Sequence, residues 1–291
     1  MDDQRLQAEL RALRAELKQL GTQHQRLARV FLTYISQAHL DRPERIAKAQ
    51  ELAELGITIV GGEPADPGQF DECAAIGRTD IAGLYASGVL AVSPRLVLTA
   101  AHCGPPVSTL PTTVALRIQD TSKLAGGEVL PGDFTGYPGY VEGGPHDIGV
   151  MVLPQGAQTP FVNLATTAEM QAATEVILVG FGDDDAAATS GGGIKRYVSV
   201  PIQFLKGGPS DTPGNPMAKL GFDKDLEFVA GLDGAGVCIG DSGGPAYIEV
   251  GGVRKVAGIS SRIPGTVCSG LSILTRIDVH AEWILSQVPR A

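Results

Sequence analysis

The chain has 291 residues, 43% of them hydrophobic, and a formal net charge of −9. An acidic chain without a Lys/Arg cluster is a poor nucleic-acid partner, because such binding depends on neutralising phosphates. No apolar run approaches the ~20 residues of a membrane-spanning helix, so we expect a soluble protein with no membrane partner. The 38 glycines and 19 prolines indicate many turns and favour short strands over long helices.

Residues 1–58 predict a helical N-terminal segment. Its first part carries leucines at alternating spacings of four and three, the seam of a coiled coil, until Gly21 interrupts the pattern. Further helices are expected at residues 23–40 and from Pro43 to about Leu55. The segment fits a pro-region or partner-binding coiled coil, and equally an amphipathic segment that packs on the rest of the protein. The seam consists of Leu6, Leu10, Leu13, Leu17 and Leu20.

From Ile57 onward the pattern changes to short β-like runs separated by Gly and Pro. The chain therefore reads as mainly β, with two successive sets of strands and a closing helix at residues 279–288. Beyond a first strand that carries Cys73, strands are predicted at residues 84–92, 95–101, 113–119, 148–153, 175–182, 196–204, 227–231, 246–250, 256–261 and 271–276.

Residues 236–245 read Gly-Val-Cys-Ile-Gly-Asp-Ser-Gly-Gly-Pro, with Ser242 framed by glycines. Such a stretch predicts a tight exposed turn in which backbone N–H groups converge on an anion. A nucleophilic serine needs a base, and the base needs an orienting carboxylate. Upstream lie Thr-Ala-Ala-His-Cys, ending in His102 and Cys103, and then Asp147 before an apolar run.

The order His, Asp, Ser and the three surrounding motifs resemble the chymotrypsin/trypsin-like serine protease family. Ile59-Val60-Gly61-Gly62 is similar to the family's mature N-terminus. The resemblance covers residues 59–291 and implies two six-stranded antiparallel Greek-key barrels with a C-terminal helix, preceded by the helical segment at 1–58. The low number of cysteines looks more like bacterial than vertebrate members of the family.

The resemblance implies a role for each motif residue. Ser242 would attack a peptide carbonyl, His102 would accept its proton, and Asp147 would orient His102. The backbone N–H groups of Gly240 and Ser242 would hold the oxyanion. His146 precedes Asp147, but strand alternation would point it the other way. No metal and no organic cofactor is implied.

The family also implies activation by cleavage. In its members the acid before the nucleophile pairs with the α-amino group of the mature N-terminus, which here would join Asp241 to Ile59. Thr58 is not basic, so a trypsin-like activator is not expected to cut before Ile59. Activation would then depend on a different protease, on self-processing or on a helical partner.

Substrate preference is expected to be non-tryptic. Gly236 stands where trypsin-like members carry an aspartate, so a basic side chain would find no counter-charge. Ile263, at a position that is glycine in most members, would narrow the pocket, and Arg262 replaces an aromatic residue. We therefore expect a preference for small or aliphatic side chains. The predicted pocket residues are Gly236, Val237, Ser261, Arg262, Ile263 and Ser272.

The four cysteines are too widely spaced for a zinc site. The resemblance implies a Cys238–Cys268 bridge beside the pocket. The usual partner of Cys103 is missing, since Ala86 stands in its place, and we predict a Cys73–Cys103 bridge instead. Disulfides favour a secreted or periplasmic protein, whereas the charged N-terminus lacks a signal-peptide core and favours the cytoplasm.

The leading hypothesis is a serine endopeptidase that acts on protein or peptide substrates. An alternative is a protease-like binding protein whose helical segment recruits a partner. The stretch from Gly240 to Gly244 also fits the Gly-x-Ser-x-Gly turn of α/β-hydrolases. That fold needs a helix directly after the serine, whereas Pro245 and a strand-like run follow here.

Overall fold

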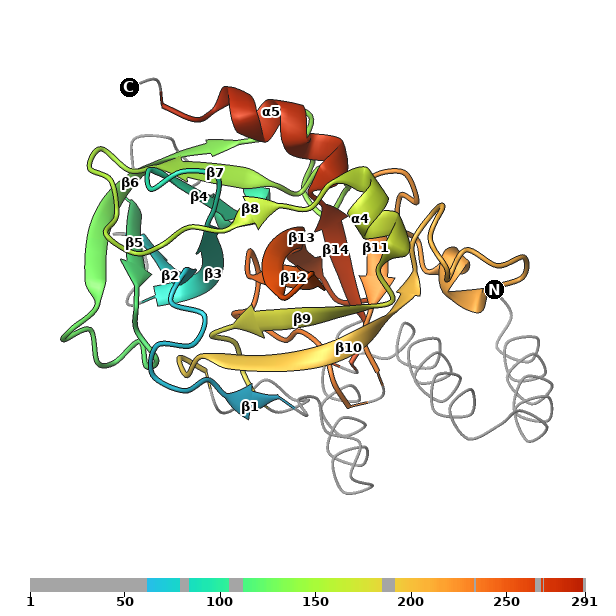
Figure 1. Cartoon of the computed structure of the whole chain (residues 1–291), viewed down its shortest axis with the longest axis horizontal. Coiled ribbons are helices and arrows are strands. Elements are labelled where there is room, and N and C mark those ends of the chain that lie inside the picture. Colours follow the sequence, from blue (N-terminus) through green and yellow to red (C-terminus); the bar gives the residue numbers. More distant parts are fainter. Residues whose placement is uncertain are drawn as a thin grey trace.

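The computed structural model describes residues 62–78, 84–104, 112–184, 192–232, 234–264, 268 and 270–289. The predicted helical segment at 1–58, its leucine seam and Ile59 lie outside the described residues. The described chain forms two β-barrels side by side, the first from blue-green strands and the second from yellow to red strands (Figure 1).

The first barrel is a closed ring of six antiparallel strands in the order β2-β3-β4-β7-β6-β5. Strand β6 was not predicted, because Pro131, Gly132 and Gly136 interrupt its sequence. It forms nevertheless, since β5 and β7 pair with it from both sides. The strands are β2 (Cys73–Arg78), β3 (Leu84–Leu90), β4 (Leu96–Thr99), β5 (Thr112–Leu116), β6 (Glu128–Gly136) and β7 (Gly149–Val152).

The second barrel closes because β9 pairs with both β10 and β12. Two short strands, β1 (Glu63–Pro64) and β8 (Asn163–Leu164), add to β10 and β13. The predicted pair of six-stranded antiparallel barrels is thus confirmed. Its strands are β9 (Glu175–Gly180), β10 (Arg196–Phe204), β11 (Glu227–Ala230), β12 (Pro245–Val250), β13 (Val253–Arg262) and β14 (Ser272–Arg276).

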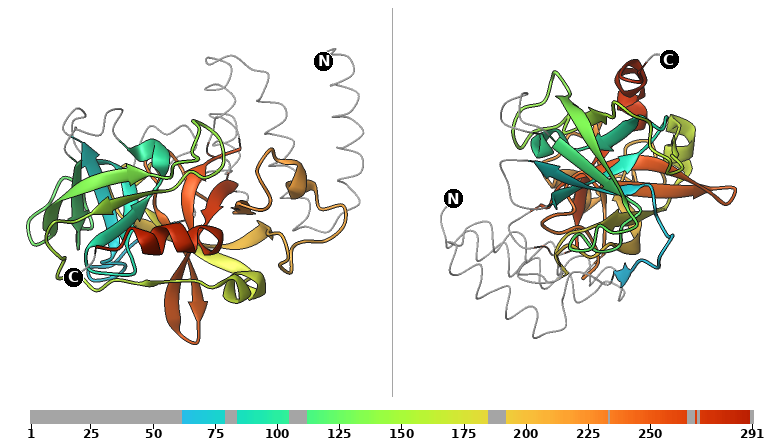
Figure 2. Two further views of the ribbon diagram at one scale, coloured as in Figure 1. Left: turned by 90° about the horizontal axis from the view of Figure 1, so that it is seen from above. Right: turned by 90° about the vertical axis from the view of Figure 1, so that its left-hand side faces the viewer.

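The predicted closing helix is α5 (Ala281–Ser286), preceded by the 3₁₀ turn η3 (Asp278–His280). It extends from the second barrel back over the first, whose core its Ile284 joins (Figure 2). Helix α4 (Thr167–Ala172) was not predicted, although Thr166 and Glu169 form a capping box at its start. Two other 3₁₀ turns are η1 (Ala101–Cys103) and η2 (Pro216–Lys219). Among the described helices, none is long and apolar enough to cross a bilayer.

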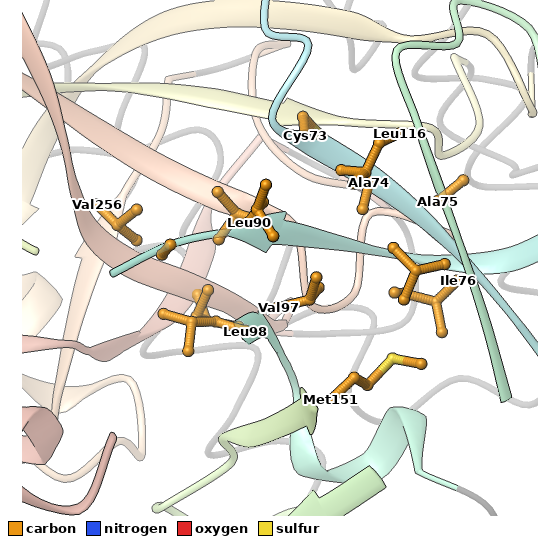
Figure 3. Close-up of a cluster of buried hydrophobic side chains, with 14 of the residues drawn as sticks. Cys73, Ala74, Ala75, Ile76, Leu90, Val97, Leu98, Leu116, Met151 and Val256 are labelled. Carbon is orange, nitrogen blue, oxygen red and sulfur yellow. The ribbon is translucent and has the colours of Figure 1, made fainter. Parts of the chain in front are cut away.

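Alternating apolar residues of the first barrel's strands fill its interior. Leu90, Leu98 and Met151 are fully buried, and Val256 of the second barrel belongs to the same cluster (Figure 3). Each such side chain stabilises the fold by about 1.5–3 kcal/mol. Because one apolar cluster spans both barrels, it holds their facing surfaces together.

The predicted Cys73–Cys103 bridge is wrong. Both cysteines are buried and free. Cys73 lies on β2 and Cys103 follows β4, and β3 stands between these two strands. Neighbouring strands are about 4.8 Å apart, so one intervening strand already exceeds the usual Cα separation of a disulfide. Burial raises the pKa of the Cys73 thiol to about 12, which keeps it protonated.

Candidate active site

His102 and Asp147 are brought together by the pairing of β4 with β7. The register aligns Thr99 with Gly149, so η1 after β4 meets the residues before β7. The Asp147 carboxylate accepts two hydrogen bonds from His102. The backbone N–H donates to Oδ1 at 3.0 Å, and ring Nδ1 lies 2.8 Å from Oδ2. This double contact fixes both the position and the tautomer of the imidazole.

Asp147 is 2% exposed, so its polar atoms need hydrogen-bond partners within the protein. The Ser261 hydroxyl donates to its Oδ2 at 2.6 Å. The Thr275 hydroxyl donates to its backbone oxygen at 3.0 Å, which anchors the residue to β14. Four hydrogen bonds from three residues therefore hold Asp147 in one orientation.

The His102 side chain is 27% exposed and faces the solvent side of this cluster. Burial lowers its pKa, but the hydrogen bond to Asp147 and the contact with Cys103 outweigh burial and raise the pKa above 6.5. The environment thus stabilises the imidazolium that forms when His102 accepts a proton.

His146 takes no part in this contact. Its backbone has a φ of 63°, and its ring stacks on Tyr137 with centroids 4.8 Å apart. Its Nδ1 lies 3.0 Å from Nε2 of His280. The two histidines thus belong to a cluster beside α5.

Residues 236–245, which carry the predicted nucleophile Ser242, are called the nucleophile loop below. Gly240 and Gly243 have φ values of 93° and 82°, in the region that favours glycine. A Cβ on Gly243 would lie 2.4 Å from the Ser87 oxygen and 2.9 Å from the Ala100 nitrogen. The loop therefore rests directly against the chain that leads into His102.

The amides from Gly240 to Gly244 fall into two groups. Those of Asp241, Gly243 and Gly244 donate to backbone oxygens at 3.1, 2.8 and 2.8 Å. Those of Gly240 and Ser242 donate to no acceptor within the described residues. Two N–H groups on either side of Asp241 therefore have no acceptor among the described residues and are available to an anion.

Ser242 lines a hollow next to this loop. In the described part of the chain, no hydrogen bond joins its hydroxyl to His102. Such nucleophile–base contacts are often loose without substrate and tighten when it binds. The structure thus joins His102 directly to Asp147 and places the loop of Ser242 against the same segment.

Asp241 points away from the hollow into a separate small cavity. Its Oδ1 accepts from the Gly182 N–H at 2.7 Å, and its Oδ2 accepts from the Cys238 N–H at 2.8 Å. Desolvation outweighs these two bonds and raises the Asp241 pKa to about 6. Gly62 lines the same cavity. A cation placed there would relieve the desolvated carboxylate.

The hollow beside Ser242 has a volume of about 230 Å³. Gly236 and Ser272, both predicted for the pocket, are not among its lining residues. Gly236 lines the Asp241 cavity instead. Ser272 is fully buried, and its hydroxyl accepts a hydrogen bond from the N–H of the lining residue Val237 at 3.0 Å. The lining residues are Val237, Cys238, Ile239, Ser242, Ser260, Ser261, Arg262 and Ile263.

Ile239 also lines the hollow but was not predicted as a pocket residue. Its place directly before Gly240, a predicted oxyanion-hole residue, could have indicated this position. It is 64% exposed at the mouth of the hollow. The predicted Cys238–Cys268 bridge is present, with a Cα separation of 5.2 Å. It ties the nucleophile loop to the segment that precedes β14.

Arg262, which lines the hollow, forms an ion pair with a buried carboxylate. Its guanidinium donates through both Nη atoms to the carboxylate of Glu227, with Nη2 at 2.9 Å from Oε2. Glu227 is fully buried on β11. The sequence did not reveal this pair, because β14 separates β11 from β13 in the barrel.

No metal centre accompanies this site in the described ranges, where no group of three or more His, Cys, Asp or Glu side chains is placed to hold an ion.

The chain is similar to several known proteins. The family model "Trypsin" matches residues 59–284. Testisin from Homo sapiens is 26% identical over 86% of this chain and 86% of its own length. Brachyurin from Leptuca pugilator is 27% identical over 79% of this chain and 98% of that protein. Phenoloxidase-activating factor 3 from Holotrichia diomphalia is 25% identical over 79% of this chain and 72% of that protein.

A solved structure titled "atomic resolution structure of HBP" shares the fold. Its TM-score is 0.63 at 22% identity, and the match covers 80% of this chain and 98% of that one.

Proposed function

The chain belongs to the trypsin family and is a serine endopeptidase, and on this basis we propose that Ser242, His102 and Asp147 are its catalytic triad. The observation that carries this assignment is the double hydrogen bond from His102 to Asp147. The nucleophile loop beside it carries two amides without a described acceptor. Protein and peptide substrates follow from the family.

The reaction uses these groups in turn. With Nδ1–H donated to Asp147, the Nε2 lone pair of His102 accepts the proton of Ser242 as its oxygen bonds to the peptide carbonyl carbon. The N–H groups of Gly240 and Ser242 stabilise the oxyanion, at about 3–4 kcal/mol for each donor. His102 then protonates the leaving amine, and water, activated by His102, hydrolyses the acyl-enzyme.

We propose that the enzyme is made as a zymogen. Cleavage before Ile59 would free an α-amino group three residues before Gly62, which lines the Asp241 cavity. Three residues span at most about 10 Å, so the ammonium can reach the carboxylate. The desolvated Asp241 would gain its missing counter-charge. The helical segment at 1–58 would be the pro-segment, removed by a protease that accepts Thr58 or held by a helical partner.

The proposed preference is for small or aliphatic side chains before the scissile bond. Val237, Ile239 and Ile263 supply apolar lining to a hollow of about 230 Å³. Arg262 is already paired with the buried Glu227, and among the described residues no acidic side chain lines the hollow. A lysine or arginine side chain would find no counter-charge there.

The test is intact mass and N-terminal sequencing after exposure to a fluorophosphonate. Ser242→Ala is expected to abolish both labelling and hydrolysis, while Ser286→Ala, at an exposed position of α5, leaves them unchanged. Labelling only of chains that begin at Ile59 supports the zymogen. Labelling of the uncut chain contradicts activation through Ile59 and Asp241, and labelling that persists in Ser242→Ala contradicts the triad.

A further inference from the structure

Ser87, a fully buried residue of β3, reaches across the barrel boundary to the nucleophile loop. Its backbone N–H donates to the Ser242 oxygen at 2.8 Å. Its hydroxyl lies 3.0 Å from the Gly240 oxygen and 3.1 Å from the Phe181 nitrogen. One residue of the first barrel thus contacts both residues whose amides flank Asp241.

The direction of each bond is determined by chemistry. A backbone N–H only donates and a carbonyl oxygen only accepts. The Ser87 hydroxyl therefore accepts from Phe181 and must place its hydrogen on the Gly240 oxygen. The Thr99 hydroxyl donates to the Ser87 backbone oxygen at 2.8 Å, which holds the serine itself in place.

Three successive peptide planes lie between Ile239 and Ser242, and a hydrogen bond to its carbonyl holds each of them. In a planar trans peptide, a carbonyl and the following N–H point in opposite directions. The Ile239 carbonyl, which sets the Gly240 N–H, accepts from the Asp183 N–H at 2.8 Å. The Asp241 carbonyl, which sets the Ser242 N–H, accepts from the Gly244 N–H at 2.8 Å.

The peptide between them decides how the two N–H groups face each other. Its carbonyl belongs to Gly240, and the only side chain that holds it among the described residues is that of Ser87. Gly240 has a φ of 93° and, lacking a Cβ, has other conformations open to it. Without the hydroxyl, this central peptide would keep only the 3.1 Å bond from its Asp241 N–H to the Cys238 oxygen, and its carbonyl would be held by no side chain among the described residues.

We propose that Ser87 is a positioning residue for the oxyanion hole, and that it holds the Gly240–Asp241 peptide so that the Gly240 and Ser242 amides converge. This inference rests on the proposed role of those amides. The Ser87 hydroxyl acts through the Gly240 carbonyl, whereas the bond from the Ser87 backbone N–H to the Ser242 oxygen does not depend on the side chain. It lies outside every motif that the sequence singled out, 153 residues before Gly240.

The kinetic test compares Ser87→Ala with Thr112→Val. Thr112 is also a buried first-barrel residue, and its hydroxyl donates to the Gly132 oxygen on the neighbouring strand β6. With activated enzyme and peptide substrates, Ser87→Ala should lower kcat about 10- to 100-fold with KM within about twofold, because only oxyanion stabilisation is weakened. Thr112→Val should lower Tm while leaving kcat near wild type.

A second measurement needs no activity. Hydrogen exchange of peptides covering 236–245 is measured on Ser242→Ala chains with and without Ser87→Ala or Thr112→Val. Exchange in this loop should rise with Ser87→Ala only. Unchanged exchange, a kcat loss no larger than in Thr112→Val, or a loss confined to KM would overturn the proposal. Failure of the triad assignment shows separately, as absent fluorophosphonate labelling of wild-type Ser242.

Discussion

The two halves of the active site are held in different ways. On the first barrel, His102 and the buried Asp147 are connected by two hydrogen bonds, and Ser261 and Thr275 hold Asp147 from the second. The nucleophile loop depends on glycines with positive φ, and two of its amides have no acceptor among the described residues. The proposed acid–base pair is therefore preorganised by strand pairing, whereas the loop is the half that the proposed activation would change.

The strongest effect is expected from a substitution in the preorganised half. Asp147→Asn would remove the charge that stabilises the His102 imidazolium and impose a different tautomer. We expect kcat of the activated enzyme to fall about 10⁴-fold. Asp133→Asn, at an exposed position of β6, is the matched control and should leave kcat unchanged. A loss of less than about tenfold in Asp147→Asn would contradict the assigned role.

The second prediction concerns Arg262, which lines the hollow beside Ser242. Arg262→Met would leave the fully buried Glu227 carboxylate without its charged partner, with the Asp223 N–H still donating to it at 2.9 Å, and should lower the free energy of unfolding by about 3 kcal/mol. Glu227→Gln should cost less, because the Arg262 side chain is 24% exposed and can turn to water. Denaturant unfolding of both variants measures this asymmetry, and equal losses would argue against it.

The third prediction tests the nucleophile loop through the carboxyl group of Asp241. Its carboxyl pKa is raised to about 6 by desolvation, so the uncut native chain binds the proton more tightly than the unfolded chain. The protonated Asp241 carboxyl contributes about 1–3 kcal/mol to the free energy of unfolding. This contribution is fully present below the unfolded-state pKa of 3.8 and is lost as pH rises through the native-state pKa of about 6.

Denaturant unfolding of uncut Ser242→Ala between about pH 4 and pH 7 measures this loss. Adding Asp241→Asn should remove the Asp241 part of the pH slope, and so should cleavage before Ile59. An unchanged slope in the double variant would show that the carboxyl is not desolvated in solution.

The weakest of these effects is a shift in pH dependence. Because the His102 pKa is raised above 6.5, the imidazole binds its proton more tightly and is a free base only at higher pH. The ascending limb of kcat/KM should therefore have its midpoint above pH 6.5. A pH profile on an aliphatic peptide substrate measures it. A midpoint at or below 6.5 would mean that the contacts with Asp147 and Cys103 do not outweigh burial.

Much of the fold was readable from the sequence, because strands separated by Gly and Pro leave local signals. The missed elements show where those signals end. Strand β6 contains Pro131 and two glycines and exists only because both neighbours pair with it. The Cys73–Cys103 prediction failed because spacing along the chain carries no information about β3 standing between β2 and β4.

Local residue patterns, through their resemblance to a protease family, were enough to indicate the chemistry that we propose for this protein. The order of His102, Asp147 and Ser242 can be read along the chain, and the glycines around the serine lie within one short stretch of it. How these groups are held depends instead on tertiary contacts. The Glu227–Arg262 pair and the contact of Ser87 with Gly240 join segments far apart in sequence. Such contacts depend on barrel closure and strand register, which local residue patterns do not encode.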